Sequence, residues 1–177
     1  MSYVLLSISG HDRPGIVRDV AESMLHLKAN IEDSSMTALR GRFTMMLIIR
    51  LPESVSLTDL RAALAELEQR TGLNIQTQPM EHKEVMVEAL EPDFVITVHG
   101  ADQVGIVHDV STALADLGVS IVDMSTRVRS QQGGDVYLMA LEVATRGHGA
   151  AMQKALEHVA GNLKIDIDCH AMDEAVL

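Results

Sequence analysis

The sequence predicts an α+β fold of two tandem ferredoxin-like units, each a four-stranded antiparallel sheet with two helices on one face. First, the chain repeats itself: a shift of 90 residues places "SGHDRPGIVRDV" (9–20) on "HGADQVGIVHDV" (99–110), with eleven identities between positions 10 and 35. Second, the apolar periodicity of each copy reads β-α-β-β-α-β. That order is the split β-α-β arrangement.

The first copy begins with a strand and a helix. Residues 4–9 are apolar and β-prone. Residues 14–28 predict a helix, with Pro14 in its first turn and Asp12 placed to cap or bias its N-terminus. Its buried side is expected to carry apolar residues at helical spacing: Ile16, Val17, Val20, Met24 and Leu27.

A hairpin follows. Residues 30–38 predict a strand, with Ile31 as its clearest inward residue. The stretch "RGRF" predicts a tight connection, and residues 43–51 predict the strongest strand of the chain. Both faces of 43–51 are apolar, with Phe43, Met45, Leu47 and Ile49 on one side and Met46 and Ile48 on the other. The helix-free face is therefore expected to pack on the other repeat or on a second chain, and we expect a homodimer.

The first copy closes with a helix and a strand. The helix begins near Ser56, which forms an S-x-x-D capping pattern with Asp59, and ends at "TG" (71–72). The last strand, 73–80, is expected to stop at Pro79.

The second copy repeats these elements with a longer "SQQGGD" turn in its hairpin. The predicted elements are strands 94–100, 120–129, 136–144 and 163–170, and helices 104–117 and 150–160. We place the domains at 1–80 and 93–177, the second with a short C-terminal tail, and a charged linker at 81–92.

Charge and cysteine content exclude several classes of function. The formal net charge of −11 argues against direct nucleic-acid binding and against an anionic membrane surface. The single cysteine, Cys169, excludes an internal disulfide and fits a reducing cytoplasm. The first apolar stretch is too short for a signal peptide or a membrane span.

The repeated glycine loop has two open interpretations. Its G-x-D-x-x-G pattern lacks the features of nucleotide loops, and its aspartate would repel a phosphate. Backbone N–H groups could instead hold the carboxylate of an amino acid, while the aspartate or a backbone carbonyl receives the ammonium group. Alternatively, Gly10 and Gly15 only permit a sharp turn and close helix–strand packing.

Catalytic and metal sites are not predicted. The eight histidines form no zinc-type spacing, and we expect no metal and no cofactor. His11 beside Asp12 lacks a recognisable Ser or Cys nucleophile. A minor alternative is an acylphosphatase-like hydrolase, in which Arg13 and Asn30 would supply the phosphate cradle and its amide; the second copy has Gln103 and Ser120 there.

The stretch "GHDRPGIVRDVAESMLHLKANIEDSSMTALRGRFTMMLIIRLP" resembles an ACT domain, a small module that commonly senses amino acids. Nearly the whole chain resembles tandem-ACT regulatory proteins of the glycine cleavage repressor type. This resemblance implies a non-enzymatic regulator in the cytoplasm that binds a small amino acid, with glycine or serine as the expected effector. It also implies a protein partner, such as a transcriptional regulator. The remaining alternative is an ACT interaction or scaffold module without ligand.

The resemblance also implies where the ligand binds: between the first strand–helix loop of one unit and the second strand of a neighbouring unit. Carried over by position, the first copy contributes Gly10, His11, Asp12, Arg13, Gly15, Ile16, Asn30 and Ile31. The second copy contributes Gly100, Ala101, Asp102, Gly105, Ile106, Ser120 and Ile121. Because the second copy lacks counterparts of Arg13, Pro14 and Asn30, a single-site protein is expected to use the first loop.

Overall fold

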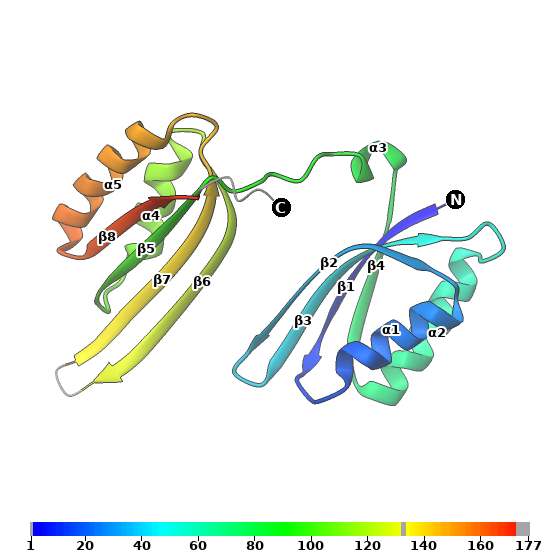
Figure 1. Ribbon diagram of the computed structural model, residues 1–177. Helices are drawn as coiled ribbons and strands as arrows, with labels where there is room; N and C mark the ends of the chain where they lie inside the picture. The colour runs from blue at the N-terminus through cyan, green and yellow to red at the C-terminus, as the bar shows by residue number, and fades with distance from the viewer. Residues whose placement is uncertain (1, 132–133, 173–177) are drawn as a thin grey trace. The chain divides into compact units, whose positions relative to one another are not determined.

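The computed structural model describes residues 2–131 and 134–172, which fall into two compact units divided between residues 88 and 89 (Figure 1). Each unit has the order β-α-β-β-α-β and one four-stranded antiparallel sheet, so the predicted fold class is confirmed. The predicted domain limits and the linker at 81–92 stay a prediction, and the tail residues 173–177 lie outside the described residues.

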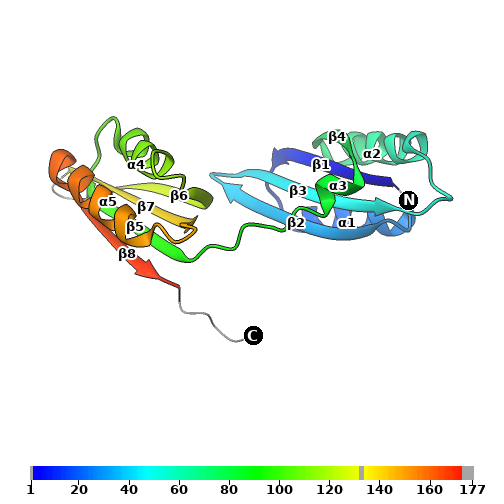
Figure 2. The ribbon, with the colours of Figure 1, turned by 90° about the horizontal axis from the view of Figure 1, so that it is seen from above.

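Unit 1 pairs its strands in the order β2-β3-β1-β4. Helices α1 and α2 lie side by side against one face of this sheet (Figure 1). The elements are β1 (Ser2–His11), α1 (Ile16–His26), β2 (Asn30–Leu39), β3 (Arg42–Leu51), α2 (Leu57–Thr71), β4 (Asn74–Met80) and α3 (His82–Val85). The short helix α3 follows β4 (Figure 2), and the His82 ring lies 5.7 Å from the Tyr3 ring of β1.

The core of unit 1 lies between the helices and one face of the sheet. Alternation along β3 buries Phe43, Met45, Leu47 and Ile49, as predicted. These side chains pack with apolar residues of the other elements: Val4, Leu6, Ile8, Ile16, Val20, Met24, Leu60, Leu64, Leu67 and Leu73. Burial of this apolar surface is the main term that stabilises the unit.

Local signals account for the hairpin and for α2. Arg40 and Gly41 have φ of 48° and 77°, the left-handed pair that matches the twist of a two-residue hairpin. At α2, the Asp59 N–H donates to Ser56 Oγ (3.1 Å) and the Ser56 N–H donates to Asp59 Oδ2 (2.9 Å). This capping box and the left-handed Gly72 at the C-terminus confirm the predicted helix limits.

The start of α1 differs from the prediction. The helix begins at Ile16 rather than residue 14, because Gly15 occupies the N-cap position with φ of 86°. The N-cap has no side-chain hydrogen bond, so Asp12 does not cap this helix, and its effect on the helix N-terminus through charge stays a prediction. The helix ends at His26, and Lys28 beyond it is left-handed (φ 52°).

Two strand predictions are also wrong. Ile31 is 39% exposed rather than inward, because β2 is an edge strand exposed along its whole length and its register shifts between Ile31 and Asp33. Pro79 does not stop β4 but lies within it, although the strand ends at Met80, the predicted limit. β4 is the other edge of the sheet, where a missing N–H donor is tolerated.

Unit 2 repeats the arrangement with strand order β6-β7-β5-β8. Its elements are β5 (Phe94–Ala101), α4 (Ile106–Ala115), β6 (Ser120–Gln131), β7 (Gly134–Ala144), α5 (Gly149–Leu163) and β8 (Asp166–Ala171). β8 starts later than predicted because α5 extends to Leu163 and closes on left-handed Lys164. Residues 132–133 of the predicted "SQQGGD" turn lie outside the described residues.

Within the described residues, no helix is long and apolar enough to cross a membrane.

Candidate functional site

The two glycine loops are built in the same way. The first joins β1 to α1, and the second joins β5 to α4. The N–H of Asp12 donates to the carbonyl of Gly41 (2.9 Å), and the N–H of Asp102 donates to the carbonyl of Asp135 (3.1 Å). Each loop is therefore held against the neighbouring hairpin at one end of its sheet.

The first glycine of each loop permits close packing. A Cβ on Gly10 would lie 2.7 Å from Leu73 Cδ2, and a Cβ on Gly100 would lie 2.6 Å from Ile165 Cγ2. Leu73 and Ile165 both follow the second helix of their unit. The chain that leaves this helix thus passes directly over the end of the first strand, which explains a glycine at both positions.

The second glycine of each loop sets the helix start. Gly15 and Gly105 have φ of 86° and 104°, a region that favours glycine. They precede Ile16 and Ile106, whose side chains are buried in the cores. Only the backbone of these two isoleucines is therefore available to a ligand, and the packing interpretation accounts for all four glycines.

The start of α1 also presents free donors. The N–H groups of Ile16 and Asp19 donate to the carbonyls of Arg13 and Gly15. Among the residues that the structure describes, the N–H groups of Val17 and Arg18 have no hydrogen-bond partner. These two donors, at the positive end of the helix dipole, could hold one carboxylate.

A buried aspartate forms ion pairs with the arginines of the first loop and the helix that follows it. Asp19 is 5% exposed and sits one turn into α1. Arg13 Nη2 lies 2.6 Å from Asp19 Oδ2, and Arg18 Nη2 lies 3.0 Å from Asp19 Oδ1. Arg13 is thus tied to the helix rather than extended toward a ligand. Sequence reasoning missed Asp19, although a charged residue three positions after Ile16 on the apolar side of a helix is the signal that marks it.

The hydrogen bonds from Arg13, and then from Arg18, hold the pKa of Asp19 below its ordinary value. We expect Arg13→Ala to raise this pKa toward that value, measured by NMR titration of the Asp19 carboxyl carbon. Because the folded-state pKa lies below the unfolded one, this stabilisation is complete above the unfolded pKa and is lost as pH falls through the folded pKa. An unchanged Asp19 pKa in Arg13→Ala would show that the ion pair is unimportant in solution.

The second loop lacks this network. Gln103, at the position of Arg13, donates from Nε2 to the carbonyl of Leu163 (2.7 Å). Asp109, at the position of Asp19, has a side chain 45% exposed and pairs with His108 Nδ1 at 2.9 Å. The two loops have the same backbone arrangement and differ in their charged side chains.

The structure does not bring the predicted loop residues and second-strand residues together within one unit. Gly10 pairs with Phe43 on β3, whereas Asn30 pairs with Arg50, roughly 23 Å along the same strand. Ser120 and Ile121 start β6 in the same way, far from the loop of unit 2. Any ligand that touches both sets must therefore be shared with a neighbouring unit, and the site stays a prediction.

The same separation applies to Arg13 and Asn30, the two residues that the hydrolase alternative requires close together. Arg13 is engaged by Asp19, while Asn30 Nδ2 donates to Glu32 Oε1 (2.8 Å) at the other end of the sheet. Arg50 Nε contacts the same Glu32 oxygen at 2.6 Å. Arg13 and Asn30 of one unit do not form a common phosphate cradle.

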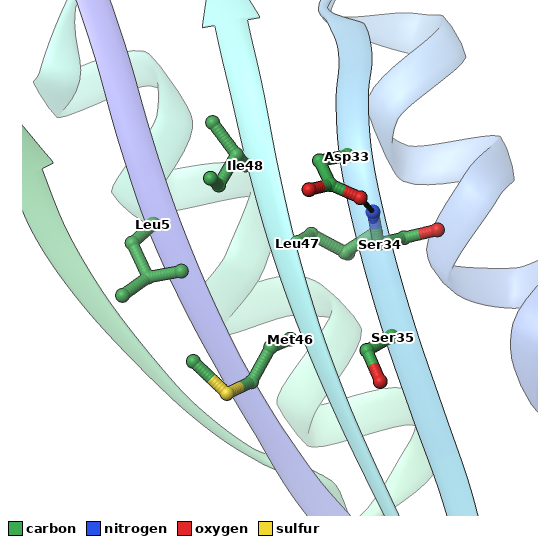
Figure 3. Close-up of a pocket in the computed structure, with 7 residues that line it drawn as sticks. All are labelled: Leu5, Asp33, Ser34, Ser35, Met46, Leu47 and Ile48. Atoms are coloured by element: carbon green, nitrogen blue, oxygen red, sulfur yellow. Dashed lines mark hydrogen bonds between the residues drawn. The ribbon is translucent and has the colours of Figure 1, made fainter. Parts of the chain in front are cut away.

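Two shallow pockets lie on the sheets. One, of about 200 Å³, is lined by seven residues (Figure 3): Leu5, Asp33, Ser34, Ser35, Met46, Leu47 and Ile48. Unit 2 has one of about 330 Å³, lined by Thr97, Val98, His99, Ser125, Arg127, Leu138, Met139 and Ala140. Neither contains a predicted site residue.

Among the described residues, no group of three His, Cys, Asp or Glu side chains is placed to hold a metal. The lone thiol, Cys169, is half-buried, and desolvation raises its pKa away from the reactive thiolate form.

Family comparisons agree with the two-unit architecture. Models of the ACT domain match residues 2–78 and 94–158. A UPF0237 protein of Methanopyrus kandleri is 35% identical over 79 residues, which cover 44% of this chain and 88% of that protein. A UPF0237 protein of Lactococcus lactis is 35% identical over 77 residues, with coverage of 42% and 84%.

Two solved structures match along the full chain. An unknown protein of Galdieria sulphuraria is 27% identical, with a TM-score of 0.78 and coverage of 97% of this chain and 99% of that one. A candidate glycine cleavage system transcriptional repressor is 16% identical, with a TM-score of 0.74 and 98% coverage of both chains. At that identity, the second likeness concerns the fold alone.

Proposed function

The chain belongs to the ACT-domain family and carries two ACT domains in tandem, and from this premise we propose that it is a regulatory protein that senses a small amino acid. Glycine and serine are the proposed effectors. The observation that carries the proposal is the tandem match itself, which covers residues 2–78 and 94–158.

The first loop supports this proposal chemically. The free N–H groups of Val17 and Arg18 suit a carboxylate, and the exposed carboxylate of Asp12 suits an ammonium group. The Arg13–Asp19 ion pair holds the loop that carries these groups. Glycine and serine each carry one carboxylate and one ammonium group.

The proposed mechanism is a shift in how ACT units pack on one another. The ligand is shared between a loop and a neighbouring second strand, so it stabilises the packing that it binds better. A homodimer is part of the proposal, because β2 lies at the edge of its sheet and carries exposed Ile31, Met36 and Leu39. The change in packing would be read by a protein partner, such as a transcriptional regulator.

The proposal includes two further properties: the protein is not an enzyme, and it lies in the cytoplasm. Separation of Arg13 from Asn30 within a unit supports the first statement over the hydrolase alternative. The single cysteine supports the second.

Calorimetric titration with glycine and serine tests the sensor function. We expect binding at millimolar or lower effector concentration, with a rise in melting temperature. Asp12→Ala should weaken binding by about tenfold or more, because it removes a hydrogen bond to a charged group. Asp102→Ala, the same change in the second loop, is the matched control and should leave binding unchanged if only the first loop binds. Absence of heat and of a melting shift with both amino acids would refute the sensor function.

A ligand-free interaction module is the second candidate. It is favoured by the packing explanation of Gly10, Gly15, Gly100 and Gly105, which needs no ligand. Failure of the calorimetric test with an intact fold would favour this candidate.

A further inference from the structure

Unit 1 carries a concentrated group of basic side chains at one end of its sheet. This arginine patch consists of His11, Arg13, Arg18, Arg40 and Arg42. The β1–β3 register pairs His11 with Arg42, and Arg42 Nη1 lies 3.2 Å from His11 Nε2. The Asp12–Gly41 hydrogen bond brings the loop to the hairpin that carries Arg40 and Arg42.

The patch keeps an excess of positive charge in an acidic protein. Four arginines face two aspartates, Asp12 and Asp19, so two positive charges remain even while His11 is neutral. Asp19 is shared by Arg13 and Arg18. Among the described residues, Arg40 and Arg42 have no acidic partner, and both are exposed. Their guanidinium groups are free to meet carboxylates of another molecule.

The fold does not require this charge. At the equivalent positions of unit 2, Ala101, Gln103, His108 and Val136 replace His11, Arg13, Arg18 and Arg42. There, Asp102, Asp109 and Asp135 are balanced by Arg127, Arg129 and Lys164. The same backbone thus carries a positive end in unit 1 and a balanced one in unit 2, so the patch is not a consequence of folding.

We propose that the arginine patch docks an acidic segment of the partner protein. This deepens the proposed regulatory function and rests on it, because it names the chemistry of the partner through which that function acts. The side chains of the patch are exposed, which suits a peptide surface better than an enclosed small-ligand site.

Charge complementarity selects an acidic segment over a nucleic acid. Guanidinium groups pair with carboxylates through two parallel hydrogen bonds. A short acidic segment touches only the local patch, whereas a long polyanion would also meet the field of a chain with net charge −11. Contacts of this kind speed association and weaken as salt screens them.

The arginine patch also lies next to the proposed effector site. Arg13 and Arg18 belong to the patch and hold Asp19, while the neighbouring Asp12 and the N–H of Arg18 belong to the proposed effector site. A bound effector therefore lies within one or two residues of side chains that contact the partner. Binding of the two is expected to be coupled.

The test uses the full chain and a fluorescein-labelled peptide of alternating Glu and Gly, followed by anisotropy at low and at physiological salt. We expect binding that weakens with salt and falls about tenfold in Arg40→Glu/Arg42→Glu. Lys28→Glu/Arg61→Glu is the control, since it changes net charge equally and, like Arg40, Lys28 is exposed and left-handed. The control should bind within about twofold of the unchanged chain.

Several results would overturn the proposal. These are no peptide binding, equal weakening in both double variants, or tighter binding of a single-stranded oligonucleotide of equal charge. Sedimentation that shows loss of a dimer in Arg40→Glu/Arg42→Glu would assign the patch to a second copy of this chain instead. Calorimetry with glycine and serine on the same variant reports separately on sensing, so failure of docking and failure of the sensor function are distinguishable.

Discussion

Replacing Leu47 by Ala lowers the free energy of unfolding of unit 1 by about 2–5 kcal/mol. Leu47 is fully buried in the middle of β3, and its register partner is the equally buried Leu6. The truncation removes apolar contact and leaves a cavity that the surrounding strands and helices cannot close. Urea unfolding followed by circular dichroism measures the loss, and hydrogen exchange assigns it to unit 1.

Leu25→Ala is the matched control for this change. Leu25 lies on α1 and is 73% exposed, so the same truncation removes little buried surface. Its cost should stay within about 0.5 kcal/mol. Equal losses in both variants would mean that the core of unit 1 is not centred on β3.

The second large effect is expected at the first glycine of the second loop. Gly100→Ala should destabilise unit 2 by about 1–3 kcal/mol. Its new Cβ would lie 2.6 Å from Ile165 Cγ2, 3.0 Å from Ile165 Cβ and 3.3 Å from Ile165 Cα, so backbone must move. Gly10→Ala meets the flexible end of Leu73 at 2.7 Å, with the Leu73 Cα at 3.5 Å, and should cost less, under about 1 kcal/mol.

Gly161→Ala is the control for the stability changes expected in Gly100→Ala and Gly10→Ala. Gly161 lies within α5, and a Cβ there meets no atom within 4 Å. The change should be neutral or stabilising by up to about 1 kcal/mol through helix propensity. Thermal unfolding of the three variants compares them directly. A Gly100→Ala variant as stable as the unchanged chain would contradict the packing explanation of the repeated glycine.

The elements that the sequence predicted well are those with strong local signals. The alternation of Phe43, Met45, Leu47 and Ile49 marks β3, and the Ser56–Asp59 pattern marks the start of α2. The predictions that failed concern segments whose surroundings depend on strands distant in the sequence. Ile31 is exposed because β2 has only one neighbouring strand in the sheet, and Pro79 is tolerated because β4 is the other edge.

The candidate site was predictable only in part. The loop itself stands out because it is repeated, and its second copy shows which side chains differ. The ion pair of Arg13 with Asp19 was not predicted, because it joins residues six positions apart across a turn whose left-handed Gly15 brings them together. The patch formed by His11, Arg40 and Arg42 likewise depends on the pairing of β1 with β3.

The sequence by itself determined the duplication, the order of the strands and helices, and membership in a family of regulatory domains. The duplication and the element order follow from repetition and periodicity along the chain, and the family follows from the resemblance to ACT domains. Only the tertiary structure decided that the loop glycines serve packing, that Asp19 neutralises Arg13, and that Arg40 and Arg42 extend the loop into a basic surface. Such contacts arise when strands distant in sequence pair in register, and a local pattern does not record that register.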